Sequence, residues 1–70
     1  MDFGFAIKKM KQGERVFRKS YPSRAYGIAR NGNDQMISDF TCYGHMSMAV
    51  LTTKDILAED WELFTGWNDD

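Results

Sequence analysis

Cysteine and histidine are almost absent from this 70-residue sequence, which holds one of each, Cys42 and His45. A single cysteine excludes an intramolecular disulfide, the usual staple of small secreted domains. The two residues have the types and spacing of half a zinc site, but the sequence offers no second pair, so we expect no metal and no cofactor. A Cys–His nucleophile and base would need a third, orienting group, and none stands near them. We therefore expect a protein without catalytic activity.

Long hydrophobic runs are missing as well. Residues 1–20 lack the apolar core of a signal peptide, and no segment approaches the roughly 20 apolar residues of a membrane span. We therefore expect a cytoplasmic protein that binds no membrane.

The chain is short for its content of apolar residues. Its length allows one domain, residues 1–70, which buries only about 60% of the surface that unfolding exposes. Hydrophobic residues nevertheless make up 43% of the sequence and aromatic residues 14%. This surplus exceeds what one helix and a thin sheet bury easily, and such a surplus often marks an interface. The composition therefore favours a homo-oligomer.

Charge of one sign is not in excess, since nine basic residues face ten acidic ones and the net charge is −1. This balance argues against binding to DNA or RNA polymers, which need a basic field. The distribution is uneven, because eight of the nine basic residues lie between Lys8 and Arg30. That half can present a local patch to a small anionic ligand, or it can simply be a solvated face.

The first segment predicts an amphipathic helix over residues 1–12. Its apolar residues recur at the spacing of one helix face: Phe3, Ala6, Ile7 and Met10. Asp2 is placed to cap the N-terminus of the helix, and Gly13 is placed to end it.

The rest of the chain predicts strands over residues 15–21, 25–30, 35–43, 47–52 and 59–64, where apolar and polar residues alternate or strand-forming residues gather. Pro22 indicates a turn over residues 22–24, and Asn31-Gly32 indicates a tight hairpin. Residues 53–58 suit one short helical turn capped by Thr53. The acidic tail, residues 65–70, is expected to fray, although Trp67 can pack back. The sequence thus predicts an α+β domain, an N-terminal amphipathic helix followed by a small antiparallel sheet of four to five strands.

Two runs of residues carry a resemblance to a known family. The opening run is Phe3-x-x-Ala6-Ile7-x-x-Met10-Lys11-x-Gly13-x-x-Val16-x-Arg18. The closing run is Asp55-Ile56-Leu57-Ala58-Glu59-Asp60-Trp61-Glu62. Together they resemble the Thoeris anti-defense 2 family of short phage and prophage proteins, and they cover about half of the chain.

The resemblance implies a signal sponge that acts in the cytoplasm of an infected bacterial host. Such a protein is a homo-oligomer, a dimer or tetramer, that sequesters nucleotide second messengers of bacterial immune systems. These messengers are cyclic ADP-ribose isomers and, in some members, cyclic dinucleotides, and nothing is cleaved. Where the family usually has tryptophan after the first strand, this sequence has Tyr21.

A nucleotide ligand needs cations or N–H donors for its phosphates and an aromatic face for its base. Residues 18–24 bring these types together, with Arg18 and Arg24 as candidate phosphate contacts and Tyr21 as the candidate stacking residue. The alternative is that the two arginines are surface strand residues and that Tyr21 is a strand-end aromatic.

Ribose hydroxyls need carboxylate or hydroxyl partners, for which Thr53, Asp55 and Asp60 are the candidates. Each also has a structural interpretation, Thr53 and Asp55 as helix caps and Asp60 as a tie to a loop N–H. Trp61 is interpreted as a core or interface anchor.

Two rival functions stay open at this point. One is a small protein–protein interaction module that inhibits a host factor, and the other is a small hydrolase acting on the same messenger. A nucleotide that stabilises the folded protein and is recovered intact would favour the sponge over both.

Overall fold

The computed structural model describes residues 1–67, which form two helices and one five-stranded antiparallel sheet. The helices are α1 (Phe3–Lys11) and α2 (Thr53–Leu57). The strands, in the spatial order β4-β3-β2-β1-β5, are β1 (Val16–Arg18), β2 (Tyr21–Asn31), β3 (Asp34–Thr41), β4 (Met46–Met48) and β5 (Trp61–Leu63). The predicted α+β order, a helix followed by an antiparallel sheet, is confirmed.

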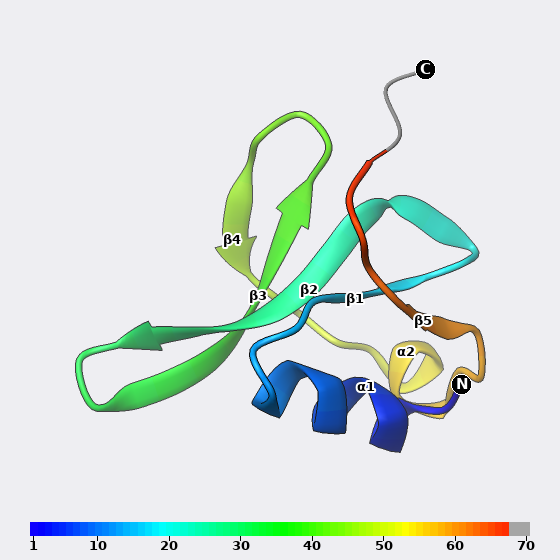
Figure 1. The fold of residues 1–70 in the computed structure, drawn as a ribbon, viewed down its shortest axis with the longest axis horizontal. Coiled ribbons are helices and arrows are strands. Elements are labelled where there is room, and N and C mark those ends of the chain that lie inside the picture. The colour runs from blue at the N-terminus through cyan, green and yellow to red at the C-terminus, as the bar shows by residue number, and fades with distance from the viewer. Residues whose placement is uncertain (68–70) are drawn as a thin grey trace.

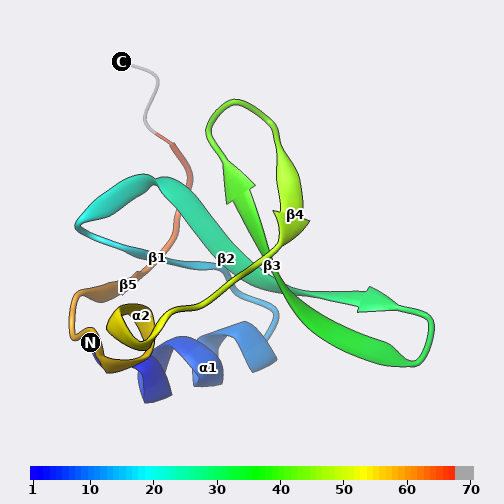
Figure 2. The same cartoon turned by 180° about the vertical axis from the view of Figure 1, so that it is seen from behind.

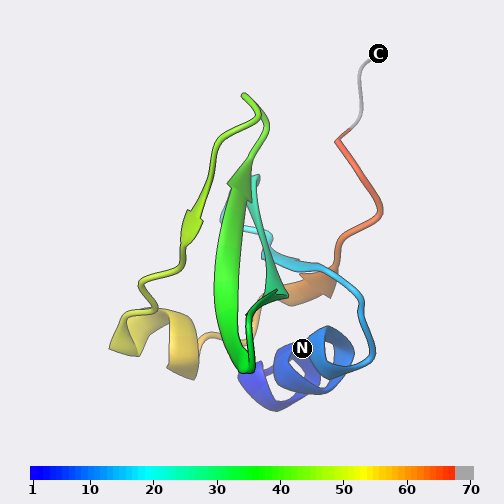
Figure 3. The same ribbon diagram turned by 90° about the vertical axis from the view of Figure 1, so that its left-hand side faces the viewer.

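The two helices lie together at the β1–β5 side of the sheet, as Figure 1 shows. The β2–β3 hairpin extends away from them as a long two-stranded arm. Figure 2 shows the segment between β4 and α2 crossing the face of the sheet on its way to α2. In Figure 3 the β3–β4 turn and the helices lie at opposite ends of the molecule. Among the described residues, no helix is long and apolar enough to cross a membrane.

Helix α1 forms as its apolar spacing predicts. Asp2 caps it, since an Asp2 carboxylate oxygen accepts a hydrogen bond of 3.0 Å from the Phe5 N–H. Ala6 and Met10, one helical turn apart, point inward and are buried. Gly13 follows the helix with a φ of +88°, a conformation that a residue with a Cβ rarely adopts. The prediction for the first segment is therefore confirmed, with ends one or two residues inside the predicted bounds.

The core is built around Trp61 of β5, which is fully buried. Its ring lies 5.6 Å from that of Phe3 in α1 and 5.4 Å from that of Tyr26 in β2, centroid to centroid. Its indole N–H donates a 2.9 Å hydrogen bond to the Asp55 carbonyl of α2. Val16, Ala6 and Met10 complete the buried cluster around it. The interpretation of Trp61 as a core anchor is thus confirmed.

The predicted turn over residues 22–24 is wrong, because these residues belong to β2. The chain turns earlier, at Lys19 and Ser20, so Tyr21 begins β2 instead of ending the first strand. The pairing of β1 with β2 jumps from Phe17↔Ala25 to Arg18↔Tyr21, which leaves Pro22 inside an irregularity of the ladder. A proline fits there because no ladder N–H is needed from it.

The predicted strand over residues 47–52 is also wrong in extent. β4 ends at Met48, and the chain then leaves the sheet toward α2. Thr52 caps α2, and Thr53 is its first residue, which corrects the prediction that Thr53 is the cap. Thr52 and Asp55 form a reciprocal capping box, in which each side chain binds the backbone N–H of the other.

The remaining strands are shorter than predicted at one or both ends. β3 stops at Thr41 because the chain turns back at Gly44, whose N–H donates to the Thr41 carbonyl and whose φ is +88°. The hairpin predicted at Asn31-Gly32 is confirmed. Trp67 packs back as predicted, with its indole N–H 3.1 Å from the Pro22 carbonyl oxygen. The acidic end of the predicted tail, residues 68–70, lies outside the described residues.

Replacing Trp61 by alanine tests the assignment of the core. We expect Trp61→Ala to lower the free energy of unfolding by about 3–5 kcal/mol, as large-to-small changes at buried aromatics do, and to leave the domain largely unfolded at 25 °C. The measurement is urea denaturation followed by circular dichroism at one fixed protein concentration. Trp67→Ala is the control, because Trp67 is only half-buried and packs at the edge. Equal losses in the two variants would contradict the assignment.

Candidate functional site

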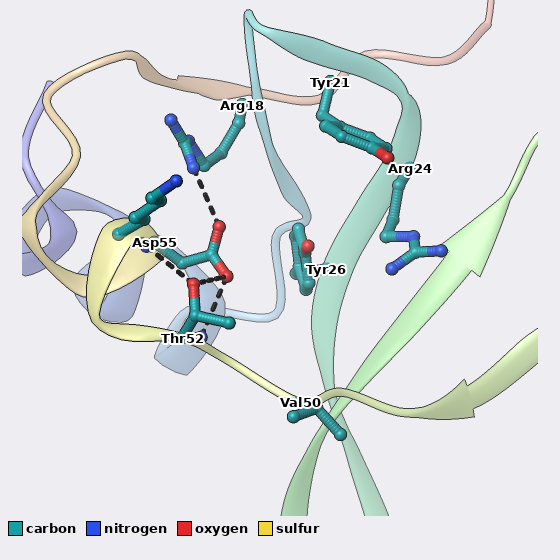
Figure 4. A pocket seen from close by; sticks show the side chains of 8 residues that line it. Arg18, Tyr21, Arg24, Tyr26, Val50, Thr52 and Asp55 are labelled. Atoms are coloured by element: carbon teal, nitrogen blue, oxygen red, sulfur yellow. Dashed lines mark hydrogen bonds and ion pairs between the residues drawn. The ribbon is translucent and has the colours of Figure 1, made fainter.

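The candidate site is a cavity of about 390 Å³ between α2, the segment before it and the start of β2. Small-molecule sites in proteins commonly measure about 300–1,000 Å³. Figure 4 shows the side chains that line the cavity. They come from β1, β2 and residues 50–55: Arg18, Tyr21, Arg24, Tyr26, Val50, Thr52, Lys54 and Asp55. Side chains far apart in the sequence thus surround one space.

One wall of the cavity is organised by Arg18 at the end of β1. Its Nε donates to an Asp60 carboxylate oxygen at 2.7 Å, and its Nη1 donates to an Asp55 carboxylate oxygen at 2.8 Å. The second oxygen of Asp60 accepts the N–H of Ser20 at 3.1 Å, and that of Asp55 accepts the N–H and hydroxyl of Thr52, each at 3.0 Å. One guanidinium therefore ties the β1–β2 turn to the first turn of α2.

These contacts set the protonation states of the wall. The hydrogen bond from Arg18, together with those from Ser20, holds the pKa of Asp60 well below its usual range. Burial opposes ionisation of Asp55, but hydrogen bonds from Thr52 and Arg18 outweigh it and lower the pKa of Asp55. The hydrogen bonds to Asp60 and Asp55 raise the pKa of Arg18. The cluster is thus fully ionised at neutral pH.

The wall formed by β2 carries a less strongly paired cation, Arg24. Arg24 of β2 has its Nη1 3.8 Å from an Asp39 carboxylate oxygen, a longer contact than those of Arg18. The Arg24 Nε is buried and has no hydrogen-bond partner among the described residues. The guanidinium carbon lies 5.8 Å from the centre of the Tyr21 ring, and Tyr21 is 60% exposed. This wall therefore offers a loosely paired guanidinium beside an accessible aromatic face.

A model of the Thoeris anti-defense 2-like domain matches residues 1–64 of this chain. The chain belongs to this family. The match runs from the first helix to the last strand and includes every residue that lines the cavity. A search among curated proteins found no match. The resemblance drawn from the opening and closing runs is confirmed, and membership supports a role in phage anti-defence.

Four of the six residues predicted for the site line the cavity of this Thoeris anti-defense 2-like domain: Arg18, Tyr21, Arg24 and Asp55. Thr53 does not line it, and Thr52 stands in its place. Asp60 lies behind Arg18, where it binds the Ser20 N–H as the structural interpretation predicted. Ligand binding by any of these residues stays a prediction.

Four lining residues were not predicted from the sequence: Tyr26, Val50, Thr52 and Lys54. One feature of the sequence could have pointed to Lys54, because it is the only lysine or arginine after Arg30. Tyr26 is nearly buried against Trp61, and this burial raises the pKa of its hydroxyl. Cys42 and His45 lie in the exposed β3–β4 turn and do not line the cavity. No group of three or more potential metal ligands is found within residues 1–67.

The lowered pKa of Asp60 predicts a pH-dependent stability. An unfolded aspartate has a pKa of about 3.9, so the stabilisation by ionised Asp60 is present above that pH and is lost as the pH falls through the lower folded pKa. We expect Asp60→Asn to be less stable than the parent protein at neutral pH, with a gap that narrows steadily below about pH 4. Urea midpoints measured from neutral to acidic pH check this. A gap that is constant across the range would contradict an ionised Asp60 paired with Arg18.

Proposed function

We propose that this protein binds a nucleotide second messenger in the cavity and sequesters it without cleavage, in the cytoplasm of an infected bacterial host. The messenger is a cyclic ADP-ribose isomer or a cyclic oligonucleotide. The observation that carries the proposal is the grouping of Tyr21, Arg24 and Lys54 around one cavity. Membership of an anti-defense family supports it independently.

The chemistry of the cavity suits each part of such a ligand. The exposed ring of Tyr21 offers a base a stacking face, which is worth about 1–3 kcal/mol in other nucleic-acid sites. Arg24 and Lys54 supply N–H donors and positive charge for phosphates. Thr52 and Asp55, at the start of α2 beside Lys54, offer hydroxyl and carboxylate groups for ribose hydroxyls. One space thus holds partners for the base, the phosphates and the sugar.

A thermal-shift screen against cyclic ADP-ribose isomers and cyclic di- and trinucleotides tests the proposal. A ligand that binds only the folded state raises the melting temperature by mass action. We expect a large shift with one class of compound and recovery of that compound intact after heat denaturation. Recovery of a cleaved product would indicate a hydrolase. The absence of any shift would favour the alternative function, a module that binds a host protein.

Substitutions at Tyr21 and Arg24 locate the ligand. We expect Tyr21→Ala and Arg24→Gln each to weaken binding by about 10- to 100-fold, because each removes a stacking face or a charged donor. Isothermal titration calorimetry with the compound found in the screen gives the affinities. Tyr43→Ala and Arg30→Gln are the matched controls, since both positions are exposed and neither lines the cavity. Equal losses in the controls, or none at Tyr21 and Arg24, would place the ligand elsewhere.

We also propose that the protein is a homo-oligomer, a dimer or tetramer, held in part by the region of β4. β4 is an edge strand, and an open edge is a template for pairing with another chain. Met46 and Met48 of β4 are each 65% exposed, and Val50 just beyond is 82% exposed. Apolar side chains this exposed along a sheet edge suit contact with a second copy.

A charge placed in the exposed apolar edge tests this proposal. We expect sedimentation velocity to show a dimer or tetramer for the parent protein and a smaller species for Met48→Lys, because the ammonium group would lose its hydration in the interface. Circular dichroism checks that the variant stays folded. A monomeric parent protein, or a variant of unchanged mass, would contradict an oligomer formed through β4.

A further inference from the structure

We infer that Arg18 is a positioning residue, which holds α2 in place as a wall of the cavity and leaves the anionic part of the ligand to Arg24 and Lys54. The inference rests on the proposed function and states which residues of the site position α2 and which bind the ligand. It also changes the role expected for Arg18 from the sequence, where an arginine beside an aromatic suggested a phosphate contact.

Two of the five N–H donors of Arg18 bind protein carboxylates, one in α2 and one in the loop before β5. Its Nε and Nη1 donate at 2.7 and 2.8 Å to two different carboxylates. Both carboxylates are anchored in turn, Asp60 by the Ser20 N–H and Asp55 by Thr52. The guanidinium of Arg18 can change its orientation only by giving up contacts that are already short and charge-assisted.

The charge of this corner is also unfavourable for a phosphate. Two ionised carboxylates surround one guanidinium, so the cluster of Arg18, Asp55 and Asp60 has a net charge of −1. Arg24 differs, because its ion pair with Asp39 spans 3.8 Å and its side chain is 42% exposed. Lys54 lines the same cavity and has no ion pair within that part of the chain. An anion therefore gains more from Arg24 of β2 and Lys54 of α2 than from Arg18.

Helix α2 needs such a tie because it has little else to hold it. It is five residues long and buries none of them. Besides its own capping box and its contact with α1, its polar ties within residues 1–67 are the Arg18–Asp55 ion pair and the hydrogen bond from the Trp61 indole to the Asp55 carbonyl. Two lining residues, Lys54 and Asp55, lie on this helix, and Thr52 caps it. The position of α2 therefore sets the shape of the cavity.

Arg18 can position α2 or bind a phosphate directly, and these two roles predict opposite changes in messenger affinity for the variant Asp60→Asn. Asp60 does not line the cavity. If Arg18 is a positioning residue, loss of the Asp60 carboxylate loosens its hold on α2. We then expect messenger binding to weaken by about tenfold, which is within the range of coupling energies between contacting residues. If Arg18 binds a phosphate directly, removal of a competing carboxylate frees the guanidinium and leaves binding equal or tighter. Equal or tighter binding by Asp60→Asn would overturn the inference.

Combined variants sharpen the comparison. Since Arg18 and Asp60 act through one tie, we expect the double variant Arg18→Gln with Asp60→Asn to bind no more weakly than Arg18→Gln alone. Arg24→Gln touches the ligand separately, so its loss should add to that of Asp60→Asn. Glu59→Gln is the matched control, because it removes the same charge at an exposed neighbouring residue and should leave binding unchanged. Additive losses for Arg18 and Asp60 would overturn the inference.

Amide hydrogen exchange tests the positioning role without any ligand. The N–H of Ile56 donates to the Thr52 carbonyl at 3.1 Å, and that of Ala58 donates to the Asp55 carbonyl at 3.3 Å. We expect these two amides to exchange about tenfold faster in Asp60→Asn and Arg18→Gln, while amides of the β2–β3 ladder keep their rates. Unchanged exchange at Ile56 and Ala58 would overturn the inference even where the nucleotide screen is negative. Faster exchange there with a negative screen would overturn the proposed function alone.

Discussion

The burial of Trp61 is the contact on which the rest of the molecule depends. A chain of this length has few residues for a core, and this one side chain touches three of its elements. Its ring packs on Phe3 of α1 and Tyr26 of β2, and its indole N–H binds the Asp55 carbonyl of α2. Because the same Tyr26 also lines the cavity, the core and the site share a side chain. The position of the wall therefore follows from the packing of the core.

The two runs that carry the family resemblance meet in space at Arg18. The opening run ends at this residue, and the closing run begins at Asp55 and contains Asp60, its two partners. In sequence the runs are separated by most of the sheet, yet their contact closes the structure from β1 to β5. The closing run also supplies Trp61, so three of its residues, Asp55, Asp60 and Trp61, fix α2, β5 and the β1–β2 turn together.

The sequence predicts an element well where the pattern that determines it lies within a few neighbouring residues. Helix α1 and the Asn31-Gly32 hairpin were predictable because a helical apolar period and a turn pair act within a few residues. The turn assigned to Pro22 failed because an irregularity in the ladder accommodates the proline, and only the pairing with β1 reveals it. Thr52 and Thr53 are the same residue type, so backbone geometry alone decides which one caps α2.

The candidate site was half predictable for the same reason. Tyr21 and Arg24 are close in sequence, so their pairing was visible in one short stretch. Tyr26, Val50 and Lys54 join them only because residues 49–52 leave the sheet and cross its face, a path that no local pattern indicates. The ties of Arg18 to Asp55 and Asp60 span 37 and 42 residues and were equally invisible.

The arrangement of charges suits a protein that acts by holding a ligand. The chain as a whole carries a net charge of −1, so it has no broad field to attract anions, and recognition must come from groups at short range. Sequestration requires affinity without turnover, and affinity rises when the site needs little ordering on binding. A short helix with no buried residue would be costly to order, but the Arg18 cluster and the Trp61 hydrogen bond hold it before any ligand arrives. The side chains that order the wall are thus different from those that we propose to contact the anion.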